Sequence, residues 1–299
     1  MIKSEFKSGF VTIVGRPNVG KSSLLNALLK QKVSIVSPKP QTTRNKITGI
    51  LNSEDYQIVF LDTPGIHKSR NKLDEYMEKS IDLSLEGVDV VLYVLDGLKP
   101  FDQEDIDRIE YYAKKTKTIV VVNKIDRSSF EKLYPKLNKL NSLKNVEDII
   151  PTSAIKGKNL DLLLEYILKY IPQGIPYYPT EDVTDVSMRF MASEIIREKM
   201  LYNLDKEVPH GIAVLIEEYT ESEQLIRIGA NIICEKQSHK NIIIGKDGAM
   251  LKKIGQQARL ELEGMVEKKI YLDLWVKVKD KWRDSQVMTI NMGYNKKDL

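Results

Sequence analysis

The chain has 299 residues, of which 42% are hydrophobic and 29% charged, and its formal net charge is +4. This composition is typical of a soluble globular protein, and every apolar run is shorter than the ~18 residues that a bilayer span needs. The length favours two domains, and so small a charge does not by itself indicate a nucleic-acid partner. Because the first ten residues lack an apolar signal-peptide core and Cys234 is the only cysteine, we expect no secretion signal, no internal disulfide and a reducing cytosol.

Residues 9–171 alternate apolar runs with amphipathic patterns, which predicts an α/β domain around a mostly parallel sheet. The expected strands are residues 10–14, 58–61, 90–95, 119–122 and 149–150. The expected helices are residues 21–29, 73–85, 103–115, 130–140 and 160–170. Residues 52–55 separate an apolar run at 46–51 from the run at 56–61 that contains the strand 58–61, so we expect a hairpin there and one antiparallel edge strand.

A linker is expected at residues 173–185, between a first domain at 1–172 and a second at 186–299 that includes a C-terminal extension. Residues 171–182 hold too many residues that break regular structure: Pro172, Gly174, Pro176 and Pro179. The second domain should be α+β, with the order helix, strand, strand, helix, strand at residues 188–204, 211–218, 226–235, 249–263 and 270–279. We expect Cys234 to be buried in the second of these strands.

The stretch from Gly15 to Ser22 follows an expected strand and precedes an expected helix, and its spacing GxxxxGKS matches a phosphate-binding loop. Glycines let backbone N–H groups wrap around an anion, and the helix turns its positive end toward that anion. We expect the Lys21 ammonium to reach the β- and γ-phosphates and the Ser22 hydroxyl to ligate magnesium. The alternative is an ordinary glycine-rich turn with a surface lysine.

A second motif runs from Asp62 to Gly65 at the end of an expected strand. Asp62 is the expected magnesium carboxylate, acting through water, and the N–H of Gly65 is placed to contact a γ-phosphate. Residues 66–71 then form an expected switch that orders with triphosphate and relaxes with diphosphate. Between the two motifs either Thr42 or Thr43 can bring another contact to magnesium, and we favour Thr43. The alternative is a plain loop that joins a helix to the hairpin.

A third motif, NKxD, runs from Asn123 to Asp126 after an apolar strand. A carboxylate at Asp126 can accept from both N1–H and the 2-amino group of guanine, a donor pair that adenine lacks. The motif therefore predicts a guanine nucleotide and disfavours an ATP-driven enzyme. Asn123 can bridge the base loop to the phosphate loop. A weaker fourth motif begins at Ser153, where a backbone N–H can meet guanine O6.

The residues expected to contact the nucleotide are Gly15, Arg16, Pro17, Asn18, Val19, Gly20, Lys21, Ser22, Ser23, Asp62, Thr63, Pro64, Gly65, Ile66, Asn123, Lys124, Asp126, Ser153, Ala154 and Ile155. Those expected to act in hydrolysis are Lys21, Thr43, Gly65 and Asn18, and the expected metal ligands are Ser22, Thr43 and Asp62. In this order the motifs resemble the GTP-binding proteins of the Ras-like fold.

Ile66 departs from that family, because it stands where Ras carries a water-orienting glutamine. The resemblance then implies slow intrinsic turnover, or water positioned by backbone groups and ions. His67 is a candidate base, although a switch-loop histidine is more often a bystander. Asn18 is a candidate contact for a potassium ion at the phosphates, since related GTPases with this asparagine resemble potassium-activated enzymes; its alternative role is to stabilise its own loop.

The C-terminal half is polarised in charge. Residues 181–235 hold 5 basic and 12 acidic side chains, whereas residues 236–283 hold 12 basic and 6 acidic ones. A run of charge is often only a solvated face. In the basic part, however, an apolar stretch runs through GKDG into an expected helix, and this pattern resembles a KH domain, of the type II variant by its element order. Such a GxxG turn lets an RNA backbone approach, beside a groove for about four unpaired nucleotides.

The residues expected to contact RNA are Ile244, Gly245, Lys246, Asp247, Gly248, Lys252 and Lys253. Over nearly its whole length the chain resembles the Era family of bacterial GTPases, through the strings GRPNVGKSSLLN, QTTRNKI, DTPGIHK, RFMASEIIREK and LWVKVKDKW. The resemblance implies a monomeric cytoplasmic GTPase that uses magnesium, holds single-stranded 16S rRNA near its 3′ end and assists assembly of the 30S subunit. It also implies a peripheral fraction at the inner face of the cell membrane.

A different class of function stays open on the sequence alone. The chain could instead be a GTP-dependent signalling switch at the membrane whose second domain docks a protein. The basic bias around GKDG favours RNA, because a protein-docking module does not need a glycine turn beside an excess of positive charge.

Overall fold

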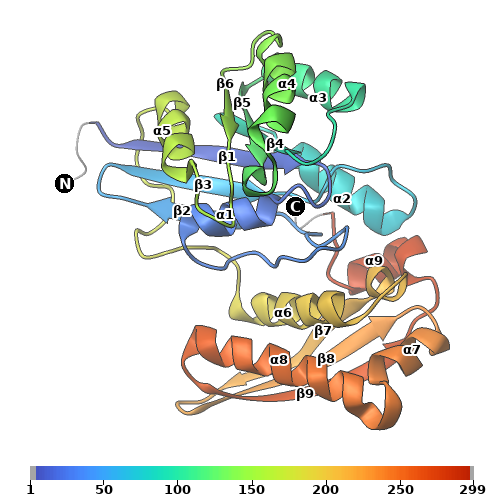
Figure 1. The fold of residues 1–299 in the computed structure, drawn as a ribbon. Helices are drawn as coiled ribbons and strands as arrows, with labels where there is room; N and C mark the ends of the chain where they lie inside the picture. Colours follow the sequence, from blue (N-terminus) through green and yellow to red (C-terminus); the bar gives the residue numbers. More distant parts are fainter. Residues whose placement is uncertain (1–4, 297–299) are drawn as a thin grey trace. The chain divides into compact units, whose positions relative to one another are not determined.

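The structure, a computed structural model, describes residues 5–296 and divides into two compact units (Figure 1). Unit 1 comprises the chain through Ser34, then Thr43–His67 and Glu78–Asp185. Unit 2 comprises Ile35–Thr42, Lys68–Met77 and the chain from Val186 onward. Two short segments of the N-terminal half therefore group with the C-terminal part of the chain. Where the functional domains begin and end stays a prediction.

Unit 1 is built on a six-stranded sheet with the strand order β2-β3-β1-β4-β5-β6. All neighbours are parallel except β2 and β3, which form the predicted antiparallel hairpin at one edge. The strands are β1 (Lys7–Gly15), β2 (Ile47–Asn52), β3 (Tyr56–Asp62), β4 (Val90–Asp96), β5 (Lys117–Asn123) and β6 (Asp148–Pro151). The apolar runs of β4 and β5 are buried because helices cover both faces of a parallel sheet.

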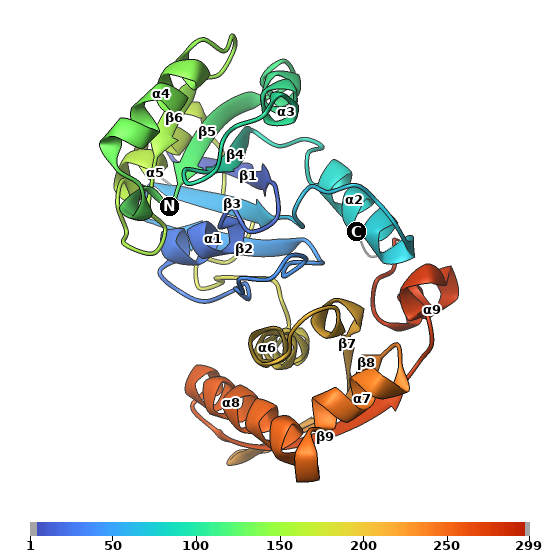
Figure 2. The same ribbon diagram turned by 45° about the vertical axis from the view of Figure 1, so that its right-hand side comes forward.

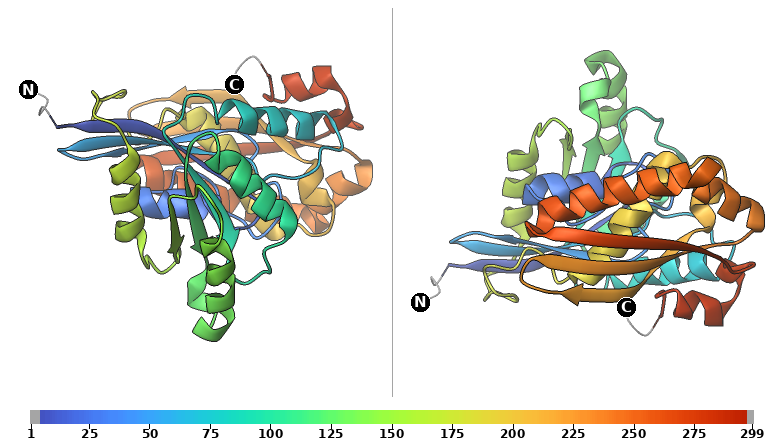
Figure 3. Two further views of the ribbon diagram at one scale, coloured as in Figure 1. Left: turned by 90° about the horizontal axis from the view of Figure 1, so that it is seen from above. Right: turned by 90° about the horizontal axis from the view of Figure 1, so that it is seen from below.

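The helices of unit 1 follow the predicted positions closely: α1 (Lys21–Leu29), α2 (Lys72–Leu83), α3 (Gln103–Ala113), α4 (Phe130–Asn141) and α5 (Leu160–Tyr170). Helices α1 and α5 contact each other on one face of the sheet, and α3 and α4 bury their apolar residues against β4 and β5 on the other (Figure 3). Helix α2 is divided, because its residues through Met77 belong to unit 2.

The carboxyl ends of the parallel strands β1, β3, β4, β5 and β6 meet at one edge of the unit 1 sheet. Each of the four sequence motifs follows one of these strands. The topology therefore brings together segments far apart in the sequence, at the place where such sheets bind ligands.

The expected linker lies along unit 1. The N–H of Ile50 in the edge strand β2 donates to the carbonyl of Val183 over 2.8 Å, and the Thr184 hydroxyl donates to the Thr48 carbonyl over 2.6 Å. The N–H of Tyr177 donates to Gln57 Oε1 over 2.6 Å. These bonds cover an edge that would otherwise expose unpaired backbone groups.

Unit 2 contains a three-stranded sheet of the order β7-β8-β9, in which β7 and β8 are antiparallel and β8 and β9 parallel. Its strands are β7 (Ala213–Glu221), β8 (Leu225–Cys234) and β9 (Lys269–Val278), and its helices are α6 (Met188–Asn203), α7 (Gln237–Ile244), α8 (Ala249–Val266) and α9 (Gln286–Asn291). Helices α6 and α8 pack their apolar residues on the same face of the sheet (Figure 3). Figure 2 shows α7 leading into α8 through a short connection.

Two helices of unit 2 correct the sequence analysis. The predicted order places no helix between β8 and α8, whereas α7 lies there, and α9 follows β9. The apolar run Ile242–Ile244 is too short and too β-branched to indicate a helix by itself. Cys234 is buried in β8, as predicted. Within residues 5–296 none of the helices has the length and apolar character that a membrane span requires.

Candidate nucleotide site and candidate RNA interface

The phosphate loop connects β1 to α1 in a conformation that only glycine allows at two positions. Gly15 has φ +147°, and a Cβ there would lie 2.4 Å from the Val94 carbonyl oxygen. Gly20 has φ +100°, and a Cβ there would lie 2.3 Å from Asn123 Nδ2. Gly20 also precedes α1 without a side-chain cap, so the N–H groups of the first turn are available to an anion.

The Lys21 ammonium is buried inside this loop. It donates to the carbonyl oxygens of Gly15 and Arg16, each over 3.2 Å. Burial lowers its pKa to about 8, and the nearby Asp62 carboxylate opposes that effect. A desolvated cation held by neutral carbonyls gains from a bound phosphate, which supplies the negative charge that the burial demands.

The predicted metal ligands converge in unit 1. Ser22 Oγ donates to Asp62 Oδ2 over 2.6 Å and lies 2.8 Å from Thr43 Oγ1. Ser34, which the sequence analysis missed, also donates to Asp62 Oδ2, over 3.0 Å. The hydroxyl of Thr42 instead donates to the Lys39 carbonyl. The structure therefore places Thr43 rather than Thr42 at Ser22, and the contact of Thr43 with magnesium stays a prediction.

Asp62 fits a hard cation. Its side chain is fully buried, and its Oδ1 has no hydrogen-bond partner among residues 5–296. Burial raises the pKa of this carboxyl, against the lowering effects of Lys21 and of the hydroxyl hydrogen bonds. A buried carboxylate beside the hydroxyls of Ser22, Ser34 and Thr43 is the oxygen-rich environment that magnesium prefers.

The segment after Asp62 packs directly on the phosphate loop. A Cβ at Gly65 would lie 2.7 Å from both Cα and N of Pro17, and the N–H of Ile66 donates to the Gly15 carbonyl over 3.0 Å. The Ile66 side chain is buried in the apolar cluster of α3 and β4. His67 Nδ1 lies 2.8 Å from the Gly65 carbonyl oxygen. Ile66 therefore contributes packing and its backbone rather than a polar side chain.

The base loop is tied to the phosphate loop as predicted for Asn123, whose Nδ2 donates to the Val19 carbonyl over 3.0 Å. The N–H of Ala154 donates to Asn123 Oδ1 over 3.1 Å, so the same amide also fixes the fourth motif. Lys124 adds a second link, because its ammonium donates to the Asn18 carbonyl over 2.5 Å.

The carboxylate expected to select guanine is held in place from one side. Asp126 Oδ1 accepts from Ser153 Oγ over 2.5 Å. Ile155 is 75% exposed. The carboxylate is thus oriented by a residue of the fourth motif.

The Arg16 side chain of the phosphate loop turns toward acidic residues of α3 and its N-cap. Its guanidinium pairs with Asp102 over 2.7 Å, with Asp105 over 2.9 Å and with Glu104 over 3.2 Å. These residues of α3 and its N-cap were absent from the predicted set. The Arg16 side chain therefore braces the loop, which leaves its backbone for the phosphates. Four predicted nucleotide contacts remain. Val19 and Ser23 lie in the phosphate loop and at the start of α1, and Thr63 and Pro64 lie in the segment after Asp62.

The candidate RNA interface lies in unit 2, where Lys246–Gly248 joins α7 to α8. Gly245 has φ +72°, Asp247 +50° and Gly248 +77°. A Cβ at Gly245 would lie 2.7 Å from Met250 Cβ, whereas a Cβ at Gly248 would have nothing within 4 Å. The turn therefore presents open backbone at Gly248, directly before the first turn of α8.

The side chains around this turn are arranged for a polyanion. Lys246, Lys252 and Lys253 are exposed, and Ile244 is half-buried against the apolar core of unit 2. Ile242 on α7, the helix that leads into this turn, is 50% exposed, and the sequence analysis did not select it. Positive charge, open backbone and an apolar surface next to each other suit an unpaired nucleic-acid strand.

Known protein families match both the N-terminal and the C-terminal part of this chain. Residues 10–124 match the family model of the 50S ribosome-binding GTPase, and residues 207–283 match that of the KH domain. The GTPase Era of Clostridium botulinum strain Okra is 52% identical over 293 residues, which cover 97% of this chain and 99% of that protein. The GTPase Era of Clostridium perfringens is 50% identical over the same shares.

Two solved structures are similar over nearly the whole chain. One is a crystal structure of Era in complex with MgGDPNP and nucleotides 1506–1542 of 16S ribosomal RNA, with a TM-score of 0.93 and 41% identity over 97% of this chain and 99% of that one. The other is a variant of Aquifex aeolicus Era bound to GDP and AlF4−, with a TM-score of 0.93, 40% identity and the same coverage. By its sequence, its fold and the geometry of its nucleotide site, this chain belongs to the Era family of GTPases.

Proposed function

We propose that this protein is a GTPase that binds single-stranded 16S rRNA near its 3′ end and assists assembly of the 30S ribosomal subunit, switching between GTP and GDP states. The observation that carries the proposal is the pairing, in one chain, of a full set of nucleotide motifs with the open GKDG turn at Gly245 to Gly248. The solved relative that holds nucleotides 1506–1542 of 16S ribosomal RNA supports the same ligand here.

The nucleotide side of the proposal assigns roles to this chain's own residues. The backbone of the phosphate loop and the Lys21 ammonium hold the phosphates, and Asp126 selects guanine through its 2-amino group. Ser22, Thr43 and Asp62 hold magnesium, which when bound neutralises charge on the β- and γ-phosphates. With Ile66 buried, backbone groups near Gly65 orient the attacking water instead of a glutamine. Asn18 is our candidate contact for potassium.

The RNA side rests on the geometry around Gly248. Its open backbone and the start of α8 receive phosphates of the strand, while Lys246, Lys252 and Lys253 add positive charge. Residues 236–283 carry 12 basic and 6 acidic side chains, so this part of unit 2 has the net positive charge that favours binding of the RNA backbone.

A direct test compares a synthetic RNA of nucleotides 1506–1542 with a scrambled RNA of the same composition. We expect the natural RNA to bind more tightly than the scrambled one, more tightly with a GTP analogue than with GDP, and to raise the GTP turnover rate. Equal binding of both RNAs with unchanged turnover would overturn the proposal. Capture of a protein or of lipid vesicles in place of RNA would favour the membrane-signalling alternative.

The cellular setting is part of the same proposal. Membership of the Era family supports a monomer in the cytoplasm that associates with the 30S subunit, together with a peripheral fraction at the inner face of the cell membrane. Cell fractionation on a sucrose gradient tests both statements. The protein should co-sediment with 30S particles, and its membrane fraction should be released by high salt; exclusive recovery in membranes would contradict the setting.

A further inference from the structure

The loop Ile35–Thr42 belongs to unit 2, although the residues on both sides of it belong to the metal site of unit 1. Before it, Ser34 Oγ donates to Asp62 over 3.0 Å. After it, Thr43 Oγ1 lies 2.8 Å from Ser22 Oγ. The covalent chain thus leaves the metal site, joins unit 2 for eight residues and returns to the metal site.

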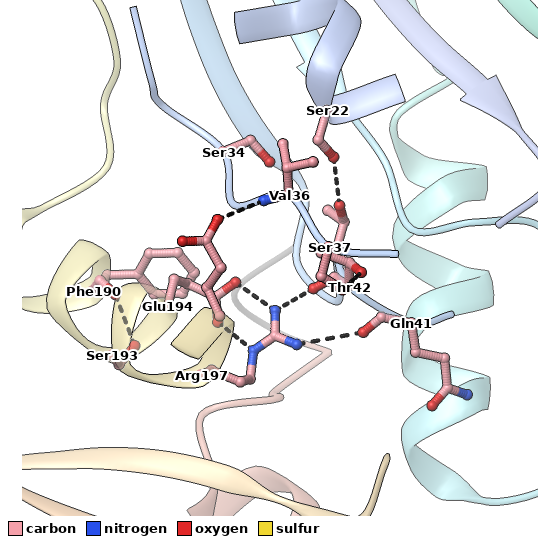
Figure 4. A network of polar contacts seen from close by, with 12 residues as sticks. Ser22, Ser34, Val36, Ser37, Gln41, Thr42, Phe190, Ser193, Glu194 and Arg197 are labelled. Atoms are coloured by element: carbon pink, nitrogen blue, oxygen red, sulfur yellow. Dashed lines mark hydrogen bonds and ion pairs between the residues drawn. The ribbon is translucent and has the colours of Figure 1, made fainter. Parts of the chain in front are cut away.

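Arg197 of helix α6 holds the far end of this loop (Figure 4). Its side chain is only 1% exposed, and its guanidinium donates to the carbonyl of Gln41 over 3.4 Å and to the carbonyl of Thr42. On its other side it donates to both carboxylate oxygens of Glu194, over 2.8 and 2.7 Å. The next residue after these two carbonyls is Thr43.

The near end of the loop is held by the same helix. The N–H of Val36 donates to Glu198 Oε1 over 2.9 Å. Glu198 in turn pairs with Lys199 over 2.8 Å, and Lys199 also pairs with Glu261 of α8. Farther along the loop, Lys39 pairs with Asp205 over 3.1 Å. Polar contacts from α6 and the residues that follow it therefore hold the loop at several points.

The burial of Arg197 makes its contacts with the loop costly to break. A guanidinium has five N–H donors, and one left without acceptors away from water is strongly destabilising. The Gln41 and Thr42 carbonyls supply acceptors that the Glu194 carboxylate alone does not replace. A change in the loop must therefore change the surroundings of Arg197, and a change in α6 must change the loop.

Helix α6 also contacts the helix that opens at the GKDG turn. Asn203 donates to Gln257 of α8 over 2.7 Å, and apolar residues of both helices share one core. A chain of contacts within unit 2 thus connects the loop Ile35–Thr42, helix α6 and helix α8.

We infer that Arg197 is a positioning residue. It fixes the backbone of Gln41 and Thr42 and thereby sets the position of Thr43. Through this position it makes GTP recognition and RNA binding depend on each other. This inference rests on the proposed function. A GTP analogue offers a γ-phosphate that requires Thr43 in place, whereas GDP does not. Because coupling between two binding sites is reciprocal, RNA should then prefer the GTP-bound protein by a factor that Arg197 maintains.

The test compares two conservative substitutions on the same helix. Arg197→Lys keeps the charge and removes the planar fork that reaches both carbonyls. Arg189→Lys is the matched control, since Arg189 also lies on α6 and donates to two carbonyls, those of Ile216 and Glu217, but these belong to β7. Arg197→Met removes the charge altogether, and thermal unfolding reports whether each variant is folded.

We expect Arg197→Lys to lower the affinity for a GTP analogue and kcat/KM for GTP about tenfold, with GDP affinity unchanged. The preference of the RNA of nucleotides 1506–1542 for the GTP-bound protein should shrink to the same extent, whereas Arg189→Lys should keep it. Arg197→Met, where folded, should lose more than Arg197→Lys.

An Arg197→Lys protein that keeps the wild-type ratio of GTP-analogue to GDP affinity would overturn the inference. So would an equal loss in Arg189→Lys, because the effect would then be a general one of helix α6. If the wild-type protein itself bound no RNA, the proposed function would be overturned. The comparison of GTP-analogue and GDP affinities would still decide whether Arg197 positions Thr43.

Discussion

The phosphate loop and the GKDG turn have similar backbone geometry but differ in the space around their last glycine. Each ends in a glycine with positive φ, Gly20 at +100° and Gly248 at +77°, and each opens a helix that has no side-chain cap. A Cβ would meet Asn123 at 2.3 Å in the first, and nothing within 4 Å in the second. An enclosed turn therefore suits one small ligand of fixed shape, whereas an open turn suits a polymer that passes across it.

The lysines beside the two turns differ in the same way. Lys21 is buried, with its ammonium on two carbonyls of its own loop, whereas Lys252 and Lys253 are exposed. A buried cation contributes through its desolvation and its fixed place. Exposed cations contribute through a screened attraction that falls with salt. Changes at the enclosed site should therefore have large, specific effects, and single charge changes at the open site small, general ones.

The largest effect is expected at the base end of the enclosed site. Asp126→Asn removes the acceptor for the guanine 2-amino group, so GTP affinity should fall by about 100-fold or more while xanthine nucleotides, whose 2-oxo group accepts, should gain. Competition between GTP and XTP for a fluorescent nucleotide measures both. A variant that still prefers GTP by orders of magnitude would show that Asp126 does not select the base.

At the open turn, Gly248→Asp should abolish specific RNA binding while GTP affinity stays at the wild-type level. The new side chain has space within the protein, and aspartate tolerates positive φ, but it places a negative charge where the RNA backbone passes. Gly264→Asp on the same helix is the matched control, because it adds the same charge at another position with open space. If folded Gly248→Asp bound the RNA as well as the control, the GKDG turn would not be the interface.

The candidate potassium contact at Asn18 tests whether the nucleotide site binds a monovalent cation. Asn18 has φ +64°, which glycine adopts freely, so Asn18→Gly removes the side chain without straining the loop. We expect wild-type GTP turnover to be about tenfold faster in potassium than in sodium, and the variant to lose that difference. Equal turnover of the wild type in both salts would remove the potassium proposal.

The buried Lys21 predicts a pH dependence with a definite sign. Its pKa in the free protein is about 8, and a bound phosphate should raise it again. On GTP binding Lys21 should therefore take up almost no proton at pH 7 and nearly one at pH 9, and GTP affinity should fall about fivefold between pH 8 and pH 9. Calorimetry in two buffers of different ionisation enthalpy measures the uptake, and Lys21→Arg should abolish it. A wild-type affinity that is flat up to pH 9 would contradict this pKa.

The smallest effect is expected for one exposed lysine. Lys253→Ala removes a single phosphate contact, so RNA affinity should fall a few-fold for all sequences, and the slope of log affinity against log salt should decrease by about 0.7. A titration at four salt concentrations gives the slope. A large loss restricted to one RNA sequence would instead assign Lys253 to base recognition.

Much of this molecule is predictable from sequence because its motifs follow strands, and strand ends of a parallel sheet converge. The hairpin edge and the bridge from Asn123 to the phosphate loop both follow from local spacing, whereas spacing alone left Thr42 and Thr43 as alternatives. Helix α7 does not follow from spacing, because Ile242–Ile244 forms a helix only where Ile243 and His239 are buried by tertiary packing.

The contacts of Arg16 with α3 and of Arg197 with the loop Ile35–Thr42 were equally invisible in the sequence. Both join residues more than 80 positions apart in the chain, at separations of 86 for Arg16 to Asp102 and 155 for Arg197 to Thr42. A single sequence does not indicate which distant residue an arginine contacts. The structure alone shows that Arg197 is buried and that it holds the loop Ile35–Thr42.

The central claim, that one chain combines a GTP site with an interface for the 3′ region of 16S rRNA, is tested most directly in the cell. Ultraviolet crosslinking of the protein, followed by sequencing of the RNA attached to it, identifies the ligand without assuming it. We expect reads to accumulate near the 3′ end of 16S rRNA in the wild type and in Gly264→Asp, and to disappear in Gly248→Asp. Recovery of unrelated RNA, or of the same reads from Gly248→Asp, would contradict the claim.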